Sequence, residues 1–203
     1  MIAIIDYGLG NLGSITNMLK HIGVSSQIIN RPEDISNADK LILPGVGAFD
    51  AGMQLLHEKG WYTVLNRAVL EEKMPILGIC LGMQLMTMRS EEGKLSGLSW
   101  VQGEAFRFPG NQITYKVPRI GWDSIFIAKK DLLFPDITEE FRFYFVHSYY
   151  IKVYEEGTEL LISQYGNVNY TAAFSKKNIW GVQFHPEKSH KYGIQFFKRF
   201  AEI

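Results

Sequence analysis

The sequence predicts an α/β fold in which a mostly parallel central sheet carries an additional antiparallel β region. Two observations support this prediction. Up to about Ser90, short apolar runs alternate with stretches of helical spacing, which is the pattern of parallel strands joined by right-handed helical crossovers. After Ser90, short segments follow one another across turns, and several alternate apolar and polar residues. Such alternation is typical of antiparallel strands with one face in water.

In the first part of the chain, four strands alternate with helices. The helix after the first strand has Leu12, Ile15, Leu19 and Ile22 on one face, and Gly23 is placed to end it. The apolar runs are short and continuous, as in strands that are buried on both faces. The expected strands are residues 2–5, 26–29, 41–43 and 75–79, and the expected helices are residues 12–22, 48–57, 61–70 and 81–86.

The second part of the chain is rich in β-strands and closes with an amphipathic helix at residues 189–201. The composition does not change abruptly anywhere, so we expect residues 1–203 to form a single domain. The expected strands of this part are residues 101–108, 122–127, 141–148, 149–153, 159–164, 169–174 and 178–184.

Composition and charge exclude several classes of protein. The 203 residues contain 21 Lys and Arg against 21 Asp and Glu, and this balance argues against nucleic-acid or anionic-membrane partners, which need a basic face. The chain begins with a strand-like segment and has no apolar run of membrane-spanning length, so no membrane partner is expected. A single cysteine excludes an internal disulfide and fits a reducing, cytoplasmic location.

Cys80 lies between an apolar strand and a predicted helix, in the pattern Gly78-x-Cys80-x-Gly82. This is the sulfur version of the nucleophile elbow, where a tight turn lifts the reactive side chain out of the sheet. Both glycines have a steric reason, because a Cβ atom beside so sharp a turn would clash. The start of a helix also favours the thiolate. The alternative is that Cys80 is a small buried apolar residue.

A second candidate group lies far along the chain, where the last strand runs into His185, Pro186 and Glu187. On an extended backbone, residues two apart point the same way, so His185 and Glu187 are expected on one face. A histidine with a carboxylate that fixes its tautomer can activate a thiol, and Cys80, His185 and Glu187 together form a candidate catalytic set. The five histidines are otherwise scattered, so we expect no metal site.

Two glycine-rich turns remain open to interpretation. Gly8, Gly10 and Gly13 match a dinucleotide-binding fingerprint, but the acidic residue expected after the second strand is missing. The alternative is a turn that lets a partner or ligand come close. Gly45 and Gly47 follow the third strand and can leave backbone N–H groups pointing at one spot, or they can belong to an ordinary loop.

At the level of motifs, residues 78–84 (GICLGMQ) and 185–187 (HPE) resemble those of the class I, or triad, glutamine amidotransferases. The resemblance extends over the whole chain. Residues 6–11, 44–49, 116–122, 144–149 and 185–189 are similar to one branch of the family, whose glutaminase subunits work with a separate (β/α)₈-barrel cyclase. The resemblance implies a three-layer fold, L-glutamine as substrate, no cofactor and no metal.

The resemblance also implies a role for individual residues. Cys80 would attack the glutamine amide, His185 would transfer protons, and Glu187 would orient His185. The oxyanion would be met by backbone N–H groups at Leu81 and the Gly45–Val46–Gly47 loop. The residues implied as oxyanion hole are Val46, Gly47 and Leu81; those implied as glutamine-binding are Gly45, Gly47, Gln84, Glu92, Ser148 and Tyr149.

The partner implied by the resemblance is the barrel cyclase, with Asn11, Trp122 and Lys188 at the interface. Arg119 and Asp123 depart from the family, which often has His and Asn there, and both lie in the docking segment. Three alternatives stay open at this stage. They are a paralogous glutaminase that supplies ammonia to a sugar amidotransferase in surface-polysaccharide synthesis, a stand-alone Cys hydrolase of the same fold, and a non-enzymatic binding module.

Overall fold

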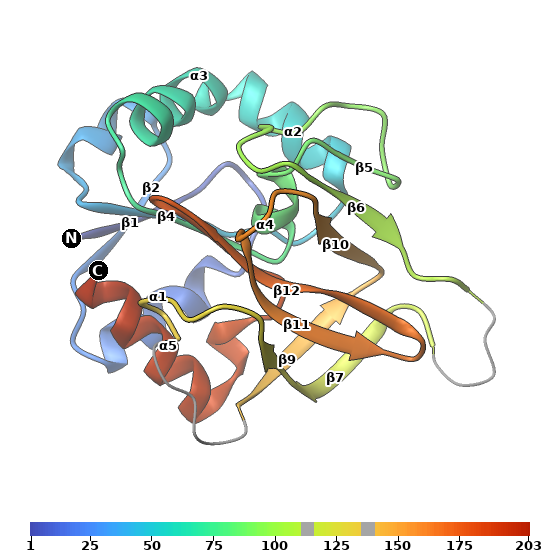
Figure 1. Cartoon of the computed structure of the whole chain (residues 1–203). Helices are drawn as coiled ribbons and strands as arrows, with labels where there is room; N and C mark the ends of the chain where they lie inside the picture. The colour runs from blue at the N-terminus through green and yellow to red at the C-terminus, as the bar shows by residue number, and fades with distance from the viewer. Residues whose placement is uncertain (111–115, 135–140) are drawn as a thin grey trace.

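The structure, a computed structural model, describes residues 1–110, 116–134 and 141–203 (Figure 1). Its centre is a mixed sheet with a parallel half. Apart from the edge strand β2, the strands of this half are mostly apolar and buried, as strands covered on both faces must be. In spatial order they are β2 (Ser26–Ile29), β1 (Ile2–Ile5), β3 (Lys40–Leu43), β4 (Ile76–Ile79) and β13 (Ile179–Val182).

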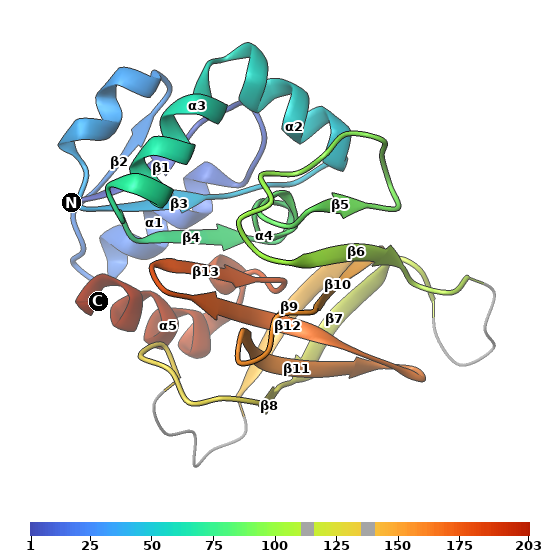
Figure 2. The same cartoon turned by 45° about the horizontal axis from the view of Figure 1, so that its top comes forward.

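Helices cover both faces of the parallel half and make three layers (Figures 1 and 2). On one face lie α1 (Leu12–His21) and α5 (His190–Glu202). On the other lie α2 (Phe49–Glu58), α3 (Trp61–Asn66) and α4 (Leu81–Leu85). A π-helical turn, η2 (Arg67–Glu71), extends α3, and a 3₁₀ helix, η1 (Pro32–Asn37), precedes β3. Within these described ranges, every helix is too short or too polar to cross a membrane.

The antiparallel region continues the same sheet from β13. The long strand β12 (Val168–Lys176) pairs antiparallel with β13, and β11 (Glu159–Tyr165) pairs with β12. The sheet then continues through β10 (Tyr149–Val153), β6 (Gly103–Arg107) and the short β5 (Arg89–Ser90). A separate two-stranded ribbon, β7 (Arg119–Ser124) with β9 (Arg142–His147), packs on the face that carries α5. The predicted fold class is therefore confirmed.

One predicted strand is wrong. Residues 122–127 do not form a continuous strand: β7 ends at Ser124, and β8 (Phe126–Ile127) pairs with β11 instead. The break at Ile125 moves the chain from the ribbon to the main sheet. The sequence shows no clear break between β7 and β8. It therefore carries no sign that the chain changes its partner strand here.

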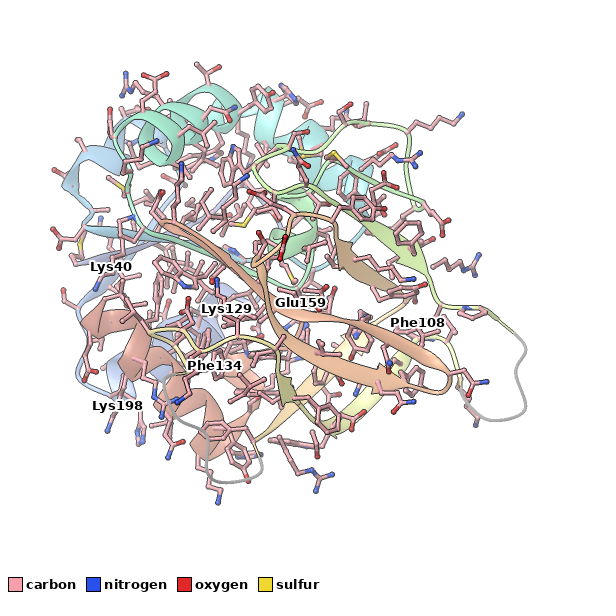
Figure 3. The ribbon with its side chains drawn as sticks, viewed as in Figure 1. Lys40, Phe108, Lys129, Phe134, Glu159 and Lys198 are labelled. Atoms are coloured by element: carbon pink, nitrogen blue, oxygen red, sulfur yellow. The ribbon has the colours of Figure 1, made fainter. Side chains whose placement is uncertain are left out.

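The core is divided by the sheet, and β1 shows how. Ile2 and Ile4 belong to the cluster under α1 and α5, whereas Ala3 and Ile5 belong to the cluster under α2 and α3. This is the alternation of side chains along a strand. The first cluster is aromatic. Phe108 and Phe134 lie inside it, while Lys198 lies on the outer side of α5 (Figure 3).

Phe184 anchors the segment that leads to His185. Its ring is fully buried and stacks on that of Phe143 in β9, with centroids 3.9 Å apart and planes 15° from parallel. The stack joins the end of the sheet to the β7–β9 ribbon.

We predict that Phe184→Ala lowers the free energy of unfolding by about 3–5 kcal/mol, because it leaves a cavity in a closely packed aromatic cluster. Urea unfolding followed by circular dichroism measures the loss. Phe126→Ala is the matched control, because that ring is 61% exposed and its loss is expected to cost less than about 0.5 kcal/mol. Equal effects of the two substitutions would contradict the anchoring role.

Candidate active site

Cys80 occupies a sharp turn between β4 and α4, as the sequence predicts. Its backbone has φ 54° and ψ −109°, a conformation that residues other than glycine rarely adopt. The turn is held by its surroundings. A Cβ atom at Gly82 would lie 1.9 Å from the carbonyl oxygen of Leu43, and one at Gly78 would lie 2.8 Å from the backbone nitrogen of Met83. The two glycines are thus required by close backbone approach.

We predict that Gly82→Ala lowers the free energy of unfolding by about 2 kcal/mol or more, because the new methyl group forces the end of β3 away from α4. Gly13→Ala is the control: nothing lies within 4 Å of its Cβ position in α1, where alanine favours the helix. Chemical denaturation of both variants measures the difference. Equal stability of the two would show that the elbow tolerates a side chain.

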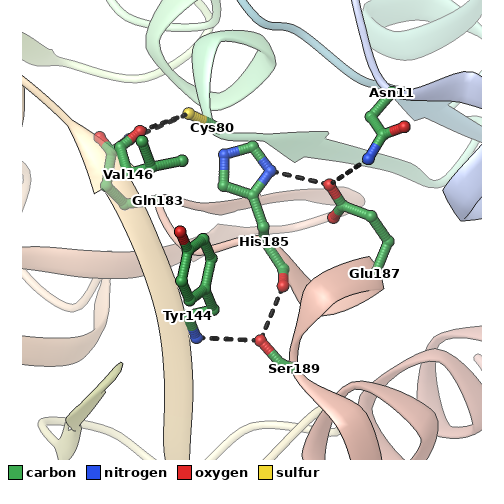
Figure 4. Close-up of polar contacts among 8 residues, drawn as sticks. All are labelled: Asn11, Cys80, Tyr144, Val146, Gln183, His185, Glu187 and Ser189. Atoms are coloured by element: carbon green, nitrogen blue, oxygen red, sulfur yellow. Dashed lines mark hydrogen bonds and ion pairs between the residues drawn. The ribbon is translucent and has the colours of Figure 1, made fainter. Parts of the chain in front are cut away.

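His185 and Glu187 are brought together, but not by an extended backbone. β13 ends at Val182, and Pro186–Lys188 form a 3₁₀ turn, η3, whose first residue follows His185. The expected extended backbone is therefore wrong, although the two side chains do lie together. The turn folds the carboxylate back on the ring, and Nδ1 of His185 lies 2.8 Å from Oε1 of Glu187 (Figure 4). Because a carboxylate accepts, Nδ1 carries the proton and Nε2 is directed to the side of Cys80.

Backbone hydrogen bonds fix this segment beside the elbow. The N–H of Cys80 donates to the carbonyl of Val182 at 2.8 Å, continuing the parallel pairing of β4 with β13. The N–H of His185 donates to the carbonyl of Tyr144 at 2.8 Å. Ser189 closes the arrangement: its hydroxyl donates to the carbonyl of His185 at 2.7 Å and accepts from the N–H of Tyr144 at 3.0 Å. The position of the imidazole is thus set by three strands.

The charge state of His185 depends on both of its neighbours. Burial, the largest single influence, lowers its pKa, but the negative charges of Cys80 and Glu187 and its hydrogen bonds to them outweigh burial and raise the pKa to about 10. At neutral pH the His185 ring is therefore protonated. A thiolate and an imidazolium side by side are the reactive form of a cysteine nucleophile.

The glycine loop after β3 lies against the elbow with its carbonyl group inward. The N–H of Leu81, which the sequence assigns to the oxyanion, donates to the carbonyl of Gly45 at 3.3 Å. The hydroxyl of the buried Tyr7 donates to the carbonyl of Pro44 at 2.8 Å and so fixes the start of the loop. An oxyanion hole would form here after the Gly45–Val46 peptide turns over. The hole, with Val46, Gly47 and Leu81, stays a prediction.

The first glycine-rich turn has a structural use. Gly8 and Gly10 have φ of 108° and 134°, and the Cβ position of Gly10 lies 3.0 Å from the side chain of Pro44. The turn thus lets the Pro44 loop of the same chain come close, a use that neither sequence interpretation named.

A pocket of about 170 Å³ opens beside Cys80. Of the residues that the sequence assigns to catalysis or glutamine binding, Gly45 and Glu187 are outside its lining. Those in the lining are Val46, Gly47, Cys80, Leu81, Gln84, Glu92, Ser148, Tyr149 and His185. Val146 and His147 complete the wall. The structure thus brings together residues from five separate segments of the chain.

The polar groups of the pocket are already oriented. Both hydrogens of Nε2 in Gln84 are used, one by the carbonyl of Tyr149 at 3.2 Å and one by Oε1 of Gln183 at 3.1 Å. Gln84 therefore offers its oxygen, an acceptor, to a ligand. Oε2 of Glu92 accepts the N–H of Phe49 at 2.8 Å, at the start of α2. An acceptor and a carboxylate in the lining of one pocket suit an ammonium group.

The residues predicted at the partner interface lie near the triad. Nδ2 of Asn11 donates to Oε1 of Glu187 at 3.5 Å, so Asn11 also contacts the carboxylate of the triad. Trp122 stacks on His190 and Lys188 lies over the ring of Tyr144. The two departures in the docking segment form one unit, because Nη2 of the buried Arg119 donates to the carboxylate of Asp123. Their role in docking stays a prediction.

Two further buried polar residues lie at the site, and neither is among the residues predicted from the sequence. Gln183 donates from Nε2 to Sγ of Cys80 at 3.6 Å. His147 donates from Nδ1 to the carbonyl of Tyr149 at 2.7 Å, and burial lowers its pKa to about 3, which keeps the ring neutral. The sequence signal for both was a polar residue at the end of, or directly after, a mainly apolar strand.

Known proteins that are similar in sequence and structure identify the family of this chain. The profile of the family described as "Glutamine amidotransferase class-I" matches residues 3–202. The chain belongs to this family. Solved structures share the fold: a glutamine amidotransferase aligns with TM-score 0.76 at 16% identity over 100% of this chain and 99% of that one. PurLQS from Thermotoga maritima aligns with TM-score 0.74, also at 16% identity, over 99% of this chain and 97% of that chain.

Curated relatives within the family are much more similar in sequence. The protein named imidazole glycerol phosphate synthase subunit HisH 2 of Methanococcus maripaludis is 50% identical over 100% of this chain and 99% of its own length. HisH 2 of Pseudomonas aeruginosa is 46% identical over the full length of both chains. HisH of Leptospira borgpetersenii is 40% identical, again over 100% of both.

Proposed function

We propose that this chain is the glutaminase subunit of an imidazole glycerol phosphate synthase and that it hydrolyses L-glutamine to glutamate and ammonia. The observation that supports hydrolysis most directly is the position of His185, bonded to Glu187 through Nδ1 and directed at Cys80 through Nε2 (Figure 4). A thiol, a base and an orienting carboxylate in this order form a nucleophile system. They lie at the edge of a pocket that contains the carboxylate of Glu92.

In the proposed reaction the Cys80 thiolate attacks the carboxamide carbon of glutamine. The carbonyl oxygen becomes an oxyanion, which the Leu81 and loop N–H groups would stabilise after the loop turns over. As the C–N bond breaks, the His185 imidazolium gives its Nε2 proton to the leaving nitrogen, and ammonia departs. Neutral His185 then takes a proton from water, which attacks the thioester and releases glutamate and the thiolate. Glu187 holds the proton of Nδ1 throughout.

The pocket orients the other end of glutamine. The carboxylate of Glu92 and the free oxygen of Gln84 would bind the α-ammonium group, and backbone at Ser148 and Tyr149 would meet the amino-acid end. The hydrogen bonds that Glu92 and Gln84 make in the structure are compatible with this role, since each of these two side chains keeps one oxygen for the ligand.

The identity of the ammonia acceptor is proposed from the relatives. Names at 40–50% identity over the whole chain support a HisH-type subunit of histidine biosynthesis. Its partner would be a (β/α)₈-barrel cyclase that uses the ammonia to convert PRFAR into imidazole glycerol phosphate and AICAR. Ammonia in neutral water becomes ammonium, which is not a nucleophile, so the active-site face should close over the partner. The free thiol of Cys80 supports a reducing location, the cytoplasm.

The test is to co-purify this chain with partners from its native host and to measure glutamate release with and without the recovered protein and its ligand. We expect slow hydrolysis by the chain alone, because the Gly45 carbonyl occupies the Leu81 N–H, and faster hydrolysis in the complex. Cys80→Ala should abolish hydrolysis and leave partner binding unchanged. Retained hydrolysis would falsify the assigned nucleophile, and equal rates with and without partner would favour a stand-alone hydrolase.

We predict that Glu187→Gln lowers kcat by about a hundredfold or more, because the tautomer and the imidazolium lose their support. Removing this negative charge lowers the pKa of His185 from about 10, so the imidazolium is lost at a lower pH. The alkaline limb of the kcat/KM profile therefore moves to lower pH. Glu202→Gln, at the exposed end of α5, controls for the change in net charge. An unmoved limb would contradict the role of Glu187.

A second candidate is a paralogous glutaminase that supplies a sugar amidotransferase in surface-polysaccharide synthesis. The paired Arg119 and Asp123 favour it, because they replace, in the docking segment, residues that the family often has as His and Asn. The same co-purification distinguishes the two, since the recovered acceptor would convert PRFAR in one case and amidate a sugar in the other.

A further inference from the structure

Gln183 lies between the nucleophile and the glutamine pocket, and its side chain is completely buried. It follows β13 directly, and its backbone N–H donates to the carbonyl of Ala172 in β12 at 2.9 Å. Its side-chain amide bridges two groups: Nε2 lies 3.6 Å from Sγ of Cys80, and Oε1 lies 3.1 Å from Nε2 of Gln84. The first is a nucleophile and the second a pocket residue in the function proposed above.

The direction of this amide is set by its neighbours. Nε2 of Gln84 donates to the carbonyl of Tyr149 and so cannot be exchanged with the oxygen of the same amide without losing that bond. Nε2 of Gln84 therefore donates its second N–H to Gln183, which must accept it through Oε1. The amide nitrogen of Gln183 is consequently turned to the sulfur.

The sulfur has opposite neighbours in its two protonation states. The carbonyl of Val146 lies 3.9 Å from Sγ and can accept from the neutral thiol. For a thiolate this carbonyl is repulsive, whereas the Nε2–H group of Gln183 becomes a charge-assisted donor. The shorter of the two contacts is the one to the donor, so the Gln183 amide is placed to hold an ionised sulfur.

We propose that Gln183 is a positioning residue that holds the Cys80 sulfur as a thiolate in line with the pocket and, through the same amide, orients Gln84. This inference rests on the proposed glutaminase function. It gives one side chain two tasks: the nitrogen end acts on the nucleophile and the oxygen end acts on the residue that would bind the amino-acid end of glutamine.

The test uses alkylation by iodoacetamide, which reacts with thiolate. The chain has a single cysteine, so the signal comes from Cys80. Gln183→Met keeps the size of the side chain but removes the donor, and we expect alkylation near neutral pH to slow about tenfold, the effect of one hydrogen bond to a charged group. The midpoint of the alkylation pH profile should move upward. Gln164→Met, the same change on the exposed edge of β11, should alkylate as wild type.

Gln183→Glu is the second variant and keeps both the shape and an acceptor for Gln84. Its carboxylate faces the sulfur, so alkylation should be slower than in Gln183→Met. The order wild type, Met, Glu supports the proposal, and the Glu variant decides where the Met variant does not fold. A variant that is less stable but alkylates with the wild-type profile would reduce Gln183 to a packing residue and overturn the proposal.

Glutaminase kinetics give the second readout. With the partner present, Gln183→Met should lower kcat through the sulfur and raise KM through Gln84, whereas wild-type values for both would contradict the proposed bridge. Alkylation does not require glutamine, so it tests Gln183 even where the wild-type complex releases no glutamate. That last result would reject the proposed function and leave the alkylation order as the judgement on Gln183.

Discussion

The parallel pairing of β4 with β13 is the constraint on which the site depends. Its register places Gly78 beside Gly181 and Ile79 beside Val182, and the N–H of Cys80 extends the ladder to the carbonyl of Val182. Two segments far apart in the sequence therefore end at the same sheet edge. Both strands are buried on both faces, so a slip would disturb the packing of two layers at once. This register therefore helps to set the distance between the sulfur of Cys80 and the imidazole of His185.

The elbow turns this alignment into chemical reactivity. The strained backbone of Cys80 lies where Gly82 packs against the end of β3, too close for a Cβ atom to fit between them. The helix that follows has five residues, so its dipole is small. The start of this helix therefore stabilises a thiolate less than the sequence predicts. In the proposed function, a thiolate would depend instead on its near neighbours, the protonated His185 ring and the Gln183 amide. Both side chains are positioned by the segment that follows β13.

How much the sequence could predict follows from how local each feature is. The alternation of strands and helices, the elbow at Cys80 and the partnership of His185 with Glu187 all arise from short patterns, and the predicted family and fold class are confirmed. The break at Ile125 and the 3₁₀ turn after His185 depend on tertiary partners, which a local pattern does not record. Gln183 looks like any polar residue near a strand end until Gln84 and Cys80 are placed on either side of it.

The position of the Gly45 carbonyl gives the proposed function a physical logic. In this conformation the N–H of Leu81 is satisfied by the protein itself, so attack on glutamine would create an oxyanion without this donor. Tyr7 fixes one end of the loop through Pro44, while Gly47, with φ of 133°, gives the other end freedom that other residues lack. In the proposed function, the Gly45–Val46 peptide between these two points would turn over to release the N–H of Leu81. An ammonia-delivering subunit benefits from such a loop, because ammonia released before the acceptor is in place would be lost to solvent as ammonium.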